Sequence, residues 1–163
     1  RWNKRIDHHI EYQQSKNWAP IAGDGELTNK TLVILGYGGI GSQVAKIGKV
    51  FGMRVTGIRR NPQDDEHADE VLGLDRFEEL LPLTDYLVLS LPDSSQTRDI
   101  INADILEKIN SSAMIINVGR GTAINEDDVY SLPRPILVGP DSISSLFQFF
   151  LFCRPFFLLF LSW

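Results

Sequence analysis

Three glycines, at positions 36, 38 and 41, stand in the stretch Gly-Tyr-Gly-Gly-Ile-Gly between an apolar run and an amphipathic stretch. Where a buried strand turns into a helix, such glycines allow a tight turn, a close approach of a pyrophosphate to the backbone, and close packing of the helix on the strand. The free amides and the positive dipole end of the helix attract phosphate. We therefore expect a dinucleotide diphosphate to bind here, and a tight turn without ligand is the alternative. The residues of this expected site are Gly36, Tyr37, Gly38, Gly39, Ile40 and Gly41.

The residues after the next apolar run bear on which dinucleotide binds. In this arrangement an Asp or Glu about 20 residues beyond the glycines accepts hydrogen bonds from the adenosine ribose. The run Met-Arg-Val-Thr-Gly-Ile ends instead in Arg59 and Arg60, with no carboxylate at its tip. Two guanidinium groups offer charge-assisted bonds to a 2′-phosphate, which a carboxylate would repel. The pair therefore favours NADP(H) over NAD(H). If the arginines are ordinary solvated charges, NAD remains the alternative cofactor.

Alternating apolar runs and helical patterns indicate how these residues are positioned. Continuous Val, Ile and Leu runs separated by helices predict a parallel sheet covered on both faces. The expected fold is α/β, a Rossmann-type doubly wound parallel sheet with helices on both faces. Strands are predicted at residues 31–35, 53–58, 71–72, 86–90 and 113–118, helices at residues 1–18, 40–51, 77–81, 103–109 and 125–130, and a loop at residues 19–29. Residues 135–138 are a weak candidate for a sixth strand, so we expect the sheet to be incomplete at its C-terminal edge.

Three motifs in this order resemble those of one known family. Residues 36–41, the stretch Leu-Pro-Asp-Ser-Ser-Gln-Thr at residues 91–97 and Asn-Val-Gly-Arg-Gly at residues 117–121 are similar to the D-isomer-specific 2-hydroxyacid dehydrogenases. Members with an arginine at the tip of the second strand, such as glyoxylate/hydroxypyruvate reductases, look most similar. The resemblance runs from about Arg1 to Leu132. It implies an NAD(P)-dependent oxidoreductase that acts on a small 2-oxo or 2-hydroxy acid and forms a homodimer largely through this domain.

The resemblance also implies roles for individual residues. Arg120 matches the arginine that binds the carboxylate and the carbonyl of the substrate. A fixed guanidinium can pair with a carboxylate and polarise the adjacent carbonyl during hydride transfer. A helix cap or a surface salt bridge is the alternative role of Arg120. The expected cofactor contacts are Gly39 and Ile40 at the pyrophosphate, Leu91 and Pro92 along the cofactor, Thr97 closing that turn, and Val118, Gly119 and Arg120 beside the nicotinamide.

The sequence departs from the family pattern after Leu132. The family continues with an Asp near the nicotinamide, a Glu in a short acidic motif, and a His near a Pro that serves as the general acid/base. After Asp128 this sequence holds one acidic residue, Asp141, and no His. Reduction of a keto acid requires a proton donor near the carbonyl oxygen. The N-terminal part of the family's second domain is also missing, so we expect a truncated domain that does not turn over as it stands.

Composition excludes several classes of function. The chain has 163 residues and a net charge of −5, and a nucleic-acid partner requires a basic face. The single Cys153 excludes an intramolecular disulfide, and no Cys or His cluster has zinc-ligand spacing, so no metal is expected. His8, His9 and His67 stand in polar stretches and are expected at the surface. The first residues lack an apolar signal segment, which favours a cytoplasmic protein.

The last 31 residues, 133–163, differ in composition from the rest. Seven of the nine Phe lie there, and 13 of the 16 residues 146–161 are apolar without helical or strand periodicity. The stretch is short for a membrane span, and Arg154 and Pro155 make insertion costly. We therefore expect residues 1–132 to form a dinucleotide-binding domain and residues 133–163 an atypical tail. A non-native extension is the favoured interpretation of this tail, and a packing or dimer segment and a membrane anchor are the alternatives.

The leading hypothesis from the sequence is the nucleotide-binding part of an NADP-preferring D-2-hydroxyacid dehydrogenase, inactive by itself. A module that senses NAD(P) without catalysis is the alternative from a different class. A membrane-tethered form and a related oxidoreductase such as a formate dehydrogenase are further alternatives. Arg59 and Arg60 disfavour the formate dehydrogenase.

Overall fold

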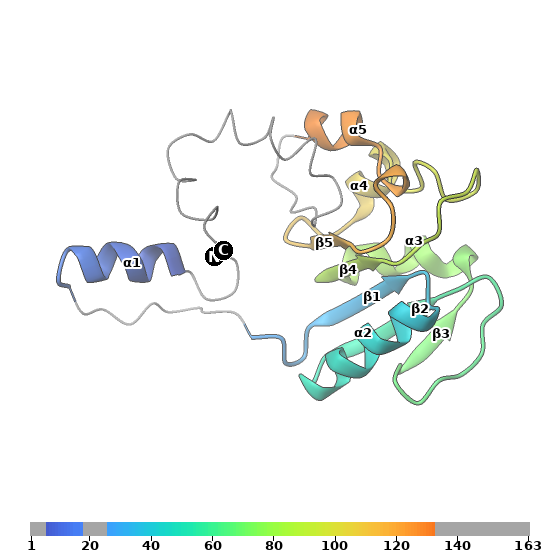
Figure 1. Cartoon of the computed structure of the whole chain (residues 1–163), viewed down its shortest axis with the longest axis horizontal. Helices are drawn as coiled ribbons and strands as arrows, with labels where there is room; N and C mark the ends of the chain where they lie inside the picture. Colours follow the sequence, from blue (N-terminus) through green and yellow to red (C-terminus); the bar gives the residue numbers. More distant parts are fainter. Residues whose placement is uncertain (1–5, 18–25, 133–163) are drawn as a thin grey trace.

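Five short strands form one parallel sheet in the order β3-β2-β1-β4-β5 (Figure 1). The computed structural model describes residues 6–17 and 26–132. The predicted α/β fold with a parallel sheet is confirmed, and every predicted strand is present with ends that move by at most one residue. The strands are β1 (Thr31–Leu35), β2 (Arg54–Ile58), β3 (Glu70–Leu72), β4 (Tyr86–Leu89) and β5 (Met114–Asn117). Residues 135–138, the candidate sixth strand, and the rest of the apolar tail lie outside the described residues.

The helices alternate with these strands as the sequence predicts. The longest of them, α2, begins at the third residue after the first glycine of the turn and carries an apolar face toward the sheet. Asn102 and Asn125 cap α4 and α5, because each side chain accepts a hydrogen bond from an amide three residues on. The α-helices are α1 (Ile6–Gln14), α2 (Gly39–Val50), α3 (Phe77–Leu80), α4 (Ala103–Lys108) and α5 (Glu126–Ser131), and short 3-10 turns occupy Leu74–Arg76, Leu81–Leu83 and Gly121–Ala123.

The first helix is shorter than the sequence predicts. The helical prediction covers residues 1–18, but α1 ends at Gln14. Ser15 Oγ bonds back to the carbonyls of Glu11 and Tyr12, and Lys16 adopts a φ of 54°, which a continuing helix does not allow. The prediction was therefore wrong at the C-terminal end of this helix.

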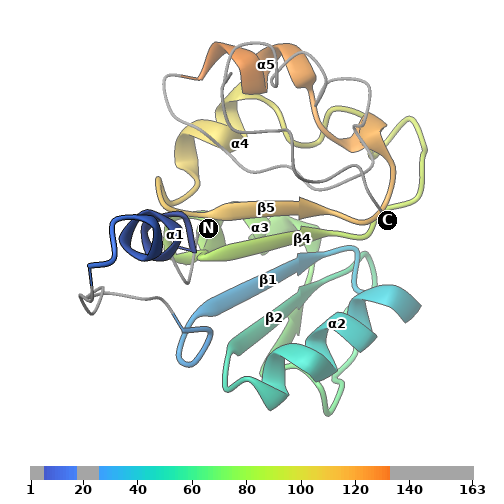
Figure 2. The same ribbon diagram turned by 60° about the vertical axis from the view of Figure 1, so that its left-hand side comes forward.

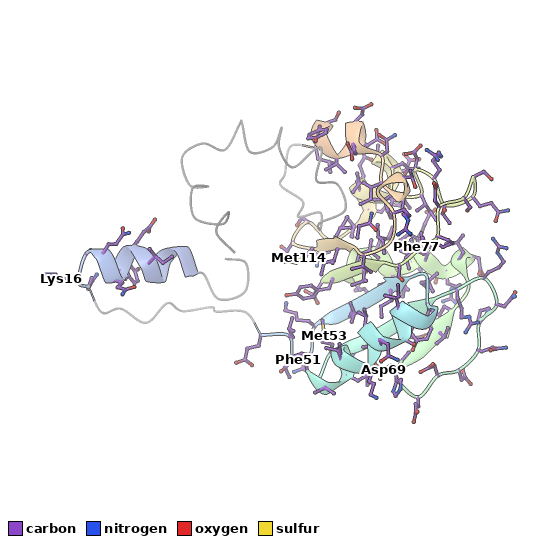
Figure 3. The ribbon with its side chains drawn as sticks, in the orientation of Figure 1. Lys16, Phe51, Met53, Asp69, Phe77 and Met114 are labelled. Atoms are coloured by element: carbon purple, nitrogen blue, oxygen red, sulfur yellow. The ribbon has the colours of Figure 1, made fainter. Side chains whose placement is uncertain are left out.

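Apolar side chains pack on both faces of the sheet. Successive residues of a strand point to opposite faces, so Leu32 and Ile34 of β1 join the layer under α2, whereas Val33 and Leu35 join the layer under α3 and α4. Figures 1 and 2 show α2 and α4 on opposite sides of the sheet. Met53 belongs to the layer under α2 and Phe77 to the layer on the other face of the sheet, and both are labelled in Figure 3. The sheet is thus covered on both faces, as a doubly wound fold requires.

The carboxyl ends of the parallel strands lie at one edge of the sheet. Because β2 and β4 both pair with β1, the loops that follow β2 and β4 flank the glycine turn that follows β1. The loop after β5 lies next to the loop after β4. In open α/β sheets, ligands bind outside this edge, where the strand order reverses. Among residues 6–17 and 26–132, no helix is long and apolar enough to span a membrane.

Candidate functional site

Gly36 begins the turn after β1 in a conformation that other residues rarely adopt. Its φ is +100°, and a Cβ at this position would lie 2.4 Å from the carbonyl oxygen of Ser90. On the other side, the amides of Gly36 and Tyr37 both donate to the carbonyl oxygen of Ile58, at 3.0 and 2.8 Å. The turn is therefore wedged between the ends of β2 and β4, and only glycine fits at its first position.

The other glycines of the turn differ in what surrounds them. A Cβ on Gly41 would lie 2.7 Å from the carbonyl oxygen of Gly36 and 3.1 Å from Ile34 Cγ2, so Gly41 is required for close packing of α2 on β1. A Cβ on Gly38 or on Gly39 would meet no atom within 4 Å. These two positions lack a side chain although the protein itself leaves space for one. This side of the turn is therefore open to a ligand that approaches the backbone.

The amino end of α2 is suited to an anion. The first amides of an α-helix have no acceptor within the helix, and no side chain caps α2, which begins after Gly38. The first turn of α2 also carries no acidic residue that would repel a phosphate. Gly38, Gly39 and Ile40 are all exposed, and the two glycines have no side chain that could shield their backbone from solvent. The residues present therefore fit a diphosphate held by main-chain amides.

Tyr37 contributes a buried side chain to the turn. Its side chain is 3% exposed, and a Cβ on Gly57 of β2 would lie 2.3 Å from its ring. The hydroxyl oxygen makes no hydrogen bond to any part of the chain that the structure describes. Burial, followed by the negative charge of Asp65, raises the pKa of Tyr37 to about 12, against a smaller opposing effect of Arg59. Tyr37 thus anchors the turn to β2 as a neutral side chain.

Arg59 and Arg60 stand at the tip of β2, as the sequence predicts. Within residues 6–17 and 26–132, neither guanidinium forms a salt bridge, and Arg59 is half-buried. Arg60 donates a hydrogen bond to the neutral amide oxygen of Gln96. Several other cations do pair with carboxylates, among them Lys49 with Asp69 at 2.5 Å. Two cations without an anionic partner beside an open glycine turn form a site suited to a phosphate.

The loop after β4 is held in a fixed turn by Thr97. Thr97 Oγ1 donates to the carbonyl oxygen of Pro92 at 2.6 Å and accepts from the amide of Ser94 at 3.0 Å. Asp93 Oδ1 accepts from Thr122 Oγ1 at 2.9 Å, which ties this loop to the loop after β5. Thr97 therefore closes the turn that carries Leu91 and Pro92.

The loop after β5 is shaped by the side chain of Asn117, which is 2% exposed. Its Oδ1 accepts from the amide of Gly119 at 3.0 Å, and its Nδ2 donates to the carbonyl oxygen of Arg120 at 2.9 Å. A Cβ on Gly119 would lie 2.7 Å from the carbonyl oxygen of Leu91, so the two loops are in close contact. Asn117 thereby fixes the backbone that carries Val118, Gly119 and Arg120.

The Arg120 guanidinium is exposed at this edge. Among the described residues, it donates one hydrogen bond, to the carbonyl oxygen of the adjacent Gly119 at 3.2 Å. Arg120 precedes the 3-10 turn Gly121–Ala123 but makes no side-chain cap there, and it forms no salt bridge with residues that the structure describes. The geometry therefore supports neither alternative role, and its role as a substrate ligand stays a prediction.

All predicted site residues come from four loops at the carboxyl edge of the sheet. Ser90 contacts the glycine turn and Leu91 contacts Gly119, so these loops form a continuous series of contacts. The sequence did not point to Gly57, Gln96 or Asn117 as site residues. Gly57 contacts the Tyr37 ring and Gln96 bonds to Arg60, so their roles depend on contacts between distant segments, and Asn117 acts through a buried side chain that bonds to its own loop. Of the three histidines, His67 is half-buried beside Glu66, with 3.8 Å between Nε2 and Oε1.

Comparison with known proteins identifies the family. A family model described as "D-isomer specific 2-hydroxyacid dehydrogenase, NAD binding domain" matches residues 1–133. The chain belongs to the D-isomer-specific 2-hydroxyacid dehydrogenase family. A glyoxylate reductase from Aeropyrum pernix is 36% identical over 126 residues, which are 73% of this chain and 37% of that protein. The resemblance that the three motifs indicate is thus confirmed.

Solved structures of the dehydrogenase family share the fold. A family protein from Aeromonas salmonicida matches with a TM-score of 0.73 and 26% identity, over 91% of this chain and 58% of that one. A probable 2-hydroxyacid dehydrogenase from Rhizobium etli, solved in complex with NADP, matches with a TM-score of 0.67 and 25% identity over 79% of this chain and 42% of that one. The chain spans less than half the length of the curated relatives that it matches.

Proposed function

We propose that this chain is the nucleotide-binding part of an NADP-preferring dehydrogenase that interconverts a small 2-oxo acid and its 2-hydroxy acid. The observation that carries the proposal is the pair Arg59 and Arg60, which lack a carboxylate partner among the described residues, beside an open glycine turn. A 2′-phosphate on the adenosine ribose is the anion that this position would receive. The NADP bound to the Rhizobium etli relative supports the preference.

Each loop has a part in this proposal. The amides around Gly39 and Ile40 hold the diphosphate, and the loop of Leu91, Pro92 and Thr97 runs along the cofactor. Val118 and Gly119 lie at its nicotinamide end, where Arg120 binds the substrate carboxylate and polarises the carbonyl. When bound, NADPH supplies the hydride for the carbonyl carbon. Glyoxylate and hydroxypyruvate are the proposed substrates, because two relatives are described as a glyoxylate reductase and as a glyoxylate reductase/hydroxypyruvate reductase.

We further propose that the 163-residue polypeptide binds the cofactor without reducing a substrate. Reduction requires a proton donor close to the carbonyl oxygen, and all three histidines precede β3 in the sequence. His67 stands three residues before β3, at the edge of the sheet opposite Arg120. The proposal also includes a domain boundary at residue 132, a homodimer and a cytoplasmic location. A dimer that forms only with bound nucleotide would favour the alternative, a sensing module.

The cofactor preference is tested by titrating the folded chain with NADPH and with NADH and following nicotinamide fluorescence. We expect tighter binding of NADPH and a loss of about tenfold for NADPH, but not NADH, in Arg59→Asp, because a charge-assisted bond is lost and a repulsive charge added. Arg54→Asp makes the same change at the amino end of the same strand and is expected to bind as the parent chain does. Preference of the unmodified chain for NADH would contradict the proposal, and oxidation of NADPH with glyoxylate would contradict the expected lack of turnover.

A further inference from the structure

Gln96 bridges the two loops that flank the glycine turn. Its amide oxygen accepts a hydrogen bond from the Arg60 guanidinium, although the two residues are 36 positions apart in the sequence. Arg60 follows β2 and Gln96 belongs to the loop after β4, and both strands pair with β1. The hydrogen bond therefore links the loop after β2 to the loop after β4, and these loops lie on either side of the glycine turn at residues 36–41.

Side-chain hydrogen bonds fix the backbone of the loop that carries Gln96. Thr97, its neighbour, bonds to Pro92 and Ser94, and Asp93 bonds to Thr122 of the next loop. A side chain presented by such a braced turn loses less freedom when it orients a partner. Arg60 is exposed, as Gln96 is, and it has the longer side chain, so its position depends on the group that accepts its hydrogen bond.

The chemical nature of the acceptor matters as much as its position. A neutral amide oxygen orients a guanidinium and leaves its positive charge available to a phosphate. A carboxylate at the same place would orient Arg60 equally well but would neutralise it. Asp93, an acid three residues before Gln96, is engaged instead by Arg98 at 3.4 Å and by Thr122.

We propose that Gln96 determines cofactor specificity by positioning Arg60 toward the 2′-phosphate of NADP(H) without neutralising the positive charge of the guanidinium. The inference rests on the proposed function. It adds to the arginine pair, which follows β2, a residue from the loop after β4. Gln96 acts through Arg60, so it is a positioning residue, and its effect is confined to the dinucleotide that carries the phosphate.

The test measures dissociation constants for NADPH and for NADH in the full chain and in Gln96→Ala and Gln96→Glu. Removing the acceptor is expected to weaken NADPH binding about threefold, because Arg60 must be immobilised on binding. Gln96→Glu is expected to weaken it further, about fivefold, because an exposed ion pair then competes with the phosphate. NADH binding stays unchanged in both variants.

Two controls isolate the contact. Ser95→Glu places the same charge one residue away and is expected to change NADPH binding less than Gln96→Glu. In an Arg60→Ala background, Gln96→Ala is expected to have no further effect, since the pair is already broken. A ratio of NADPH to NADH affinity that does not respond to Gln96, in a parent chain that prefers NADPH, overturns this inference alone. A parent chain that binds neither nucleotide, or prefers NADH, overturns the proposed function together with it.

Discussion

The aromatic ring of Tyr37 lies directly against the backbone of Gly57, so that a Cβ on Gly57 would stand 2.3 Å from Tyr37 Cδ2. Tyr37 belongs to the turn after β1, and Gly57 is the fourth residue of β2. Their contact joins the glycine turn to the strand whose tip carries Arg59 and Arg60. The relative position of the proposed diphosphate site and the arginine pair therefore depends on a glycine inside a strand, where glycine is otherwise unfavourable.

Gly57→Ala is expected to lower the free energy of unfolding by about 1–3 kcal/mol, because the added methyl overpacks a buried aromatic ring. Urea denaturation at neutral pH measures the change. Tyr37→Leu combined with Gly57→Ala should recover part of the loss, since a smaller side chain leaves room for the methyl group. Equal stability of Gly57→Ala and the parent chain would show that the ring can move away freely.

Tyr37→Phe tests the buried hydroxyl through the pH dependence of stability. The pKa of Tyr37 is raised in the folded chain from 10.0 to about 12. Between these two pH values the folded state therefore keeps a proton that the unfolded state releases. The contribution of Tyr37 to the free energy of unfolding is fully present below pH 10.0 and is lost as the pH rises toward about 12. Tyr37→Phe is expected to lack this alkaline loss in denaturant titrations. An identical alkaline slope in both proteins would contradict the burial of a protonated phenol.

The sequence predicts the sheet well because its strands are continuous apolar runs bounded by turns. Thr31–Leu35 is predicted to the residue, and α2 starts one residue earlier than predicted, at Gly39. The open backbone at Gly38 and the close packing at Gly41 also follow from the glycine spacing. These features are local, so a short window of sequence contains their cause.

What the sequence does not predict depends on contacts between distant loops. The bond between Arg60 and Gln96 requires the strand order, and an exposed Gln in a polar loop gives no signal of its own. Asn117 looks like an ordinary residue of the motif at 117–121, but its side chain is buried and shapes that loop. The early end of α1 follows from Lys16, whose left-handed backbone no pattern of apolar residues predicts.

Asn117→Ala is expected to lower the free energy of unfolding by about 2 kcal/mol, because the amide of Gly119 and the carbonyl of Arg120 lose their buried partner. Asn61→Ala, at an exposed position, is the matched control and should have little effect. Both are measured by urea denaturation. A similar small change in the two variants would mean that the backbone of the loop holds its shape without the Asn117 side chain.

Asp69→Asn tests an acid-sensitive contact at the end of α2, where Asp69 is labelled in Figure 3. The hydrogen bond from Lys49, and then that from the amide of Val55, lowers the pKa of Asp69 below its usual 3.8. This contribution to stability is present above the usual pKa and is lost as the pH falls through the lower, folded-state value. Asp69→Asn should therefore destabilise the chain near neutral pH and remove part of its acid sensitivity. Asp64→Asn, at an exposed position in the same loop, serves as control, and an unchanged acid transition in Asp69→Asn would refute the assignment.

The central claim is that main-chain amides at the turn before α2 hold the diphosphate of a dinucleotide. It is tested most directly with Gly38→Val, because a Cβ at Gly38 would meet no atom within 4 Å and would extend into the space proposed for the diphosphate. The measurement is NADPH binding by isothermal titration calorimetry, with urea denaturation to verify that both proteins are folded. We predict saturable binding by the parent chain and a loss of more than about tenfold in Gly38→Val at unchanged stability. No affinity of the folded parent chain for NADPH or NADH, or equally tight binding by Gly38→Val, would contradict the claim.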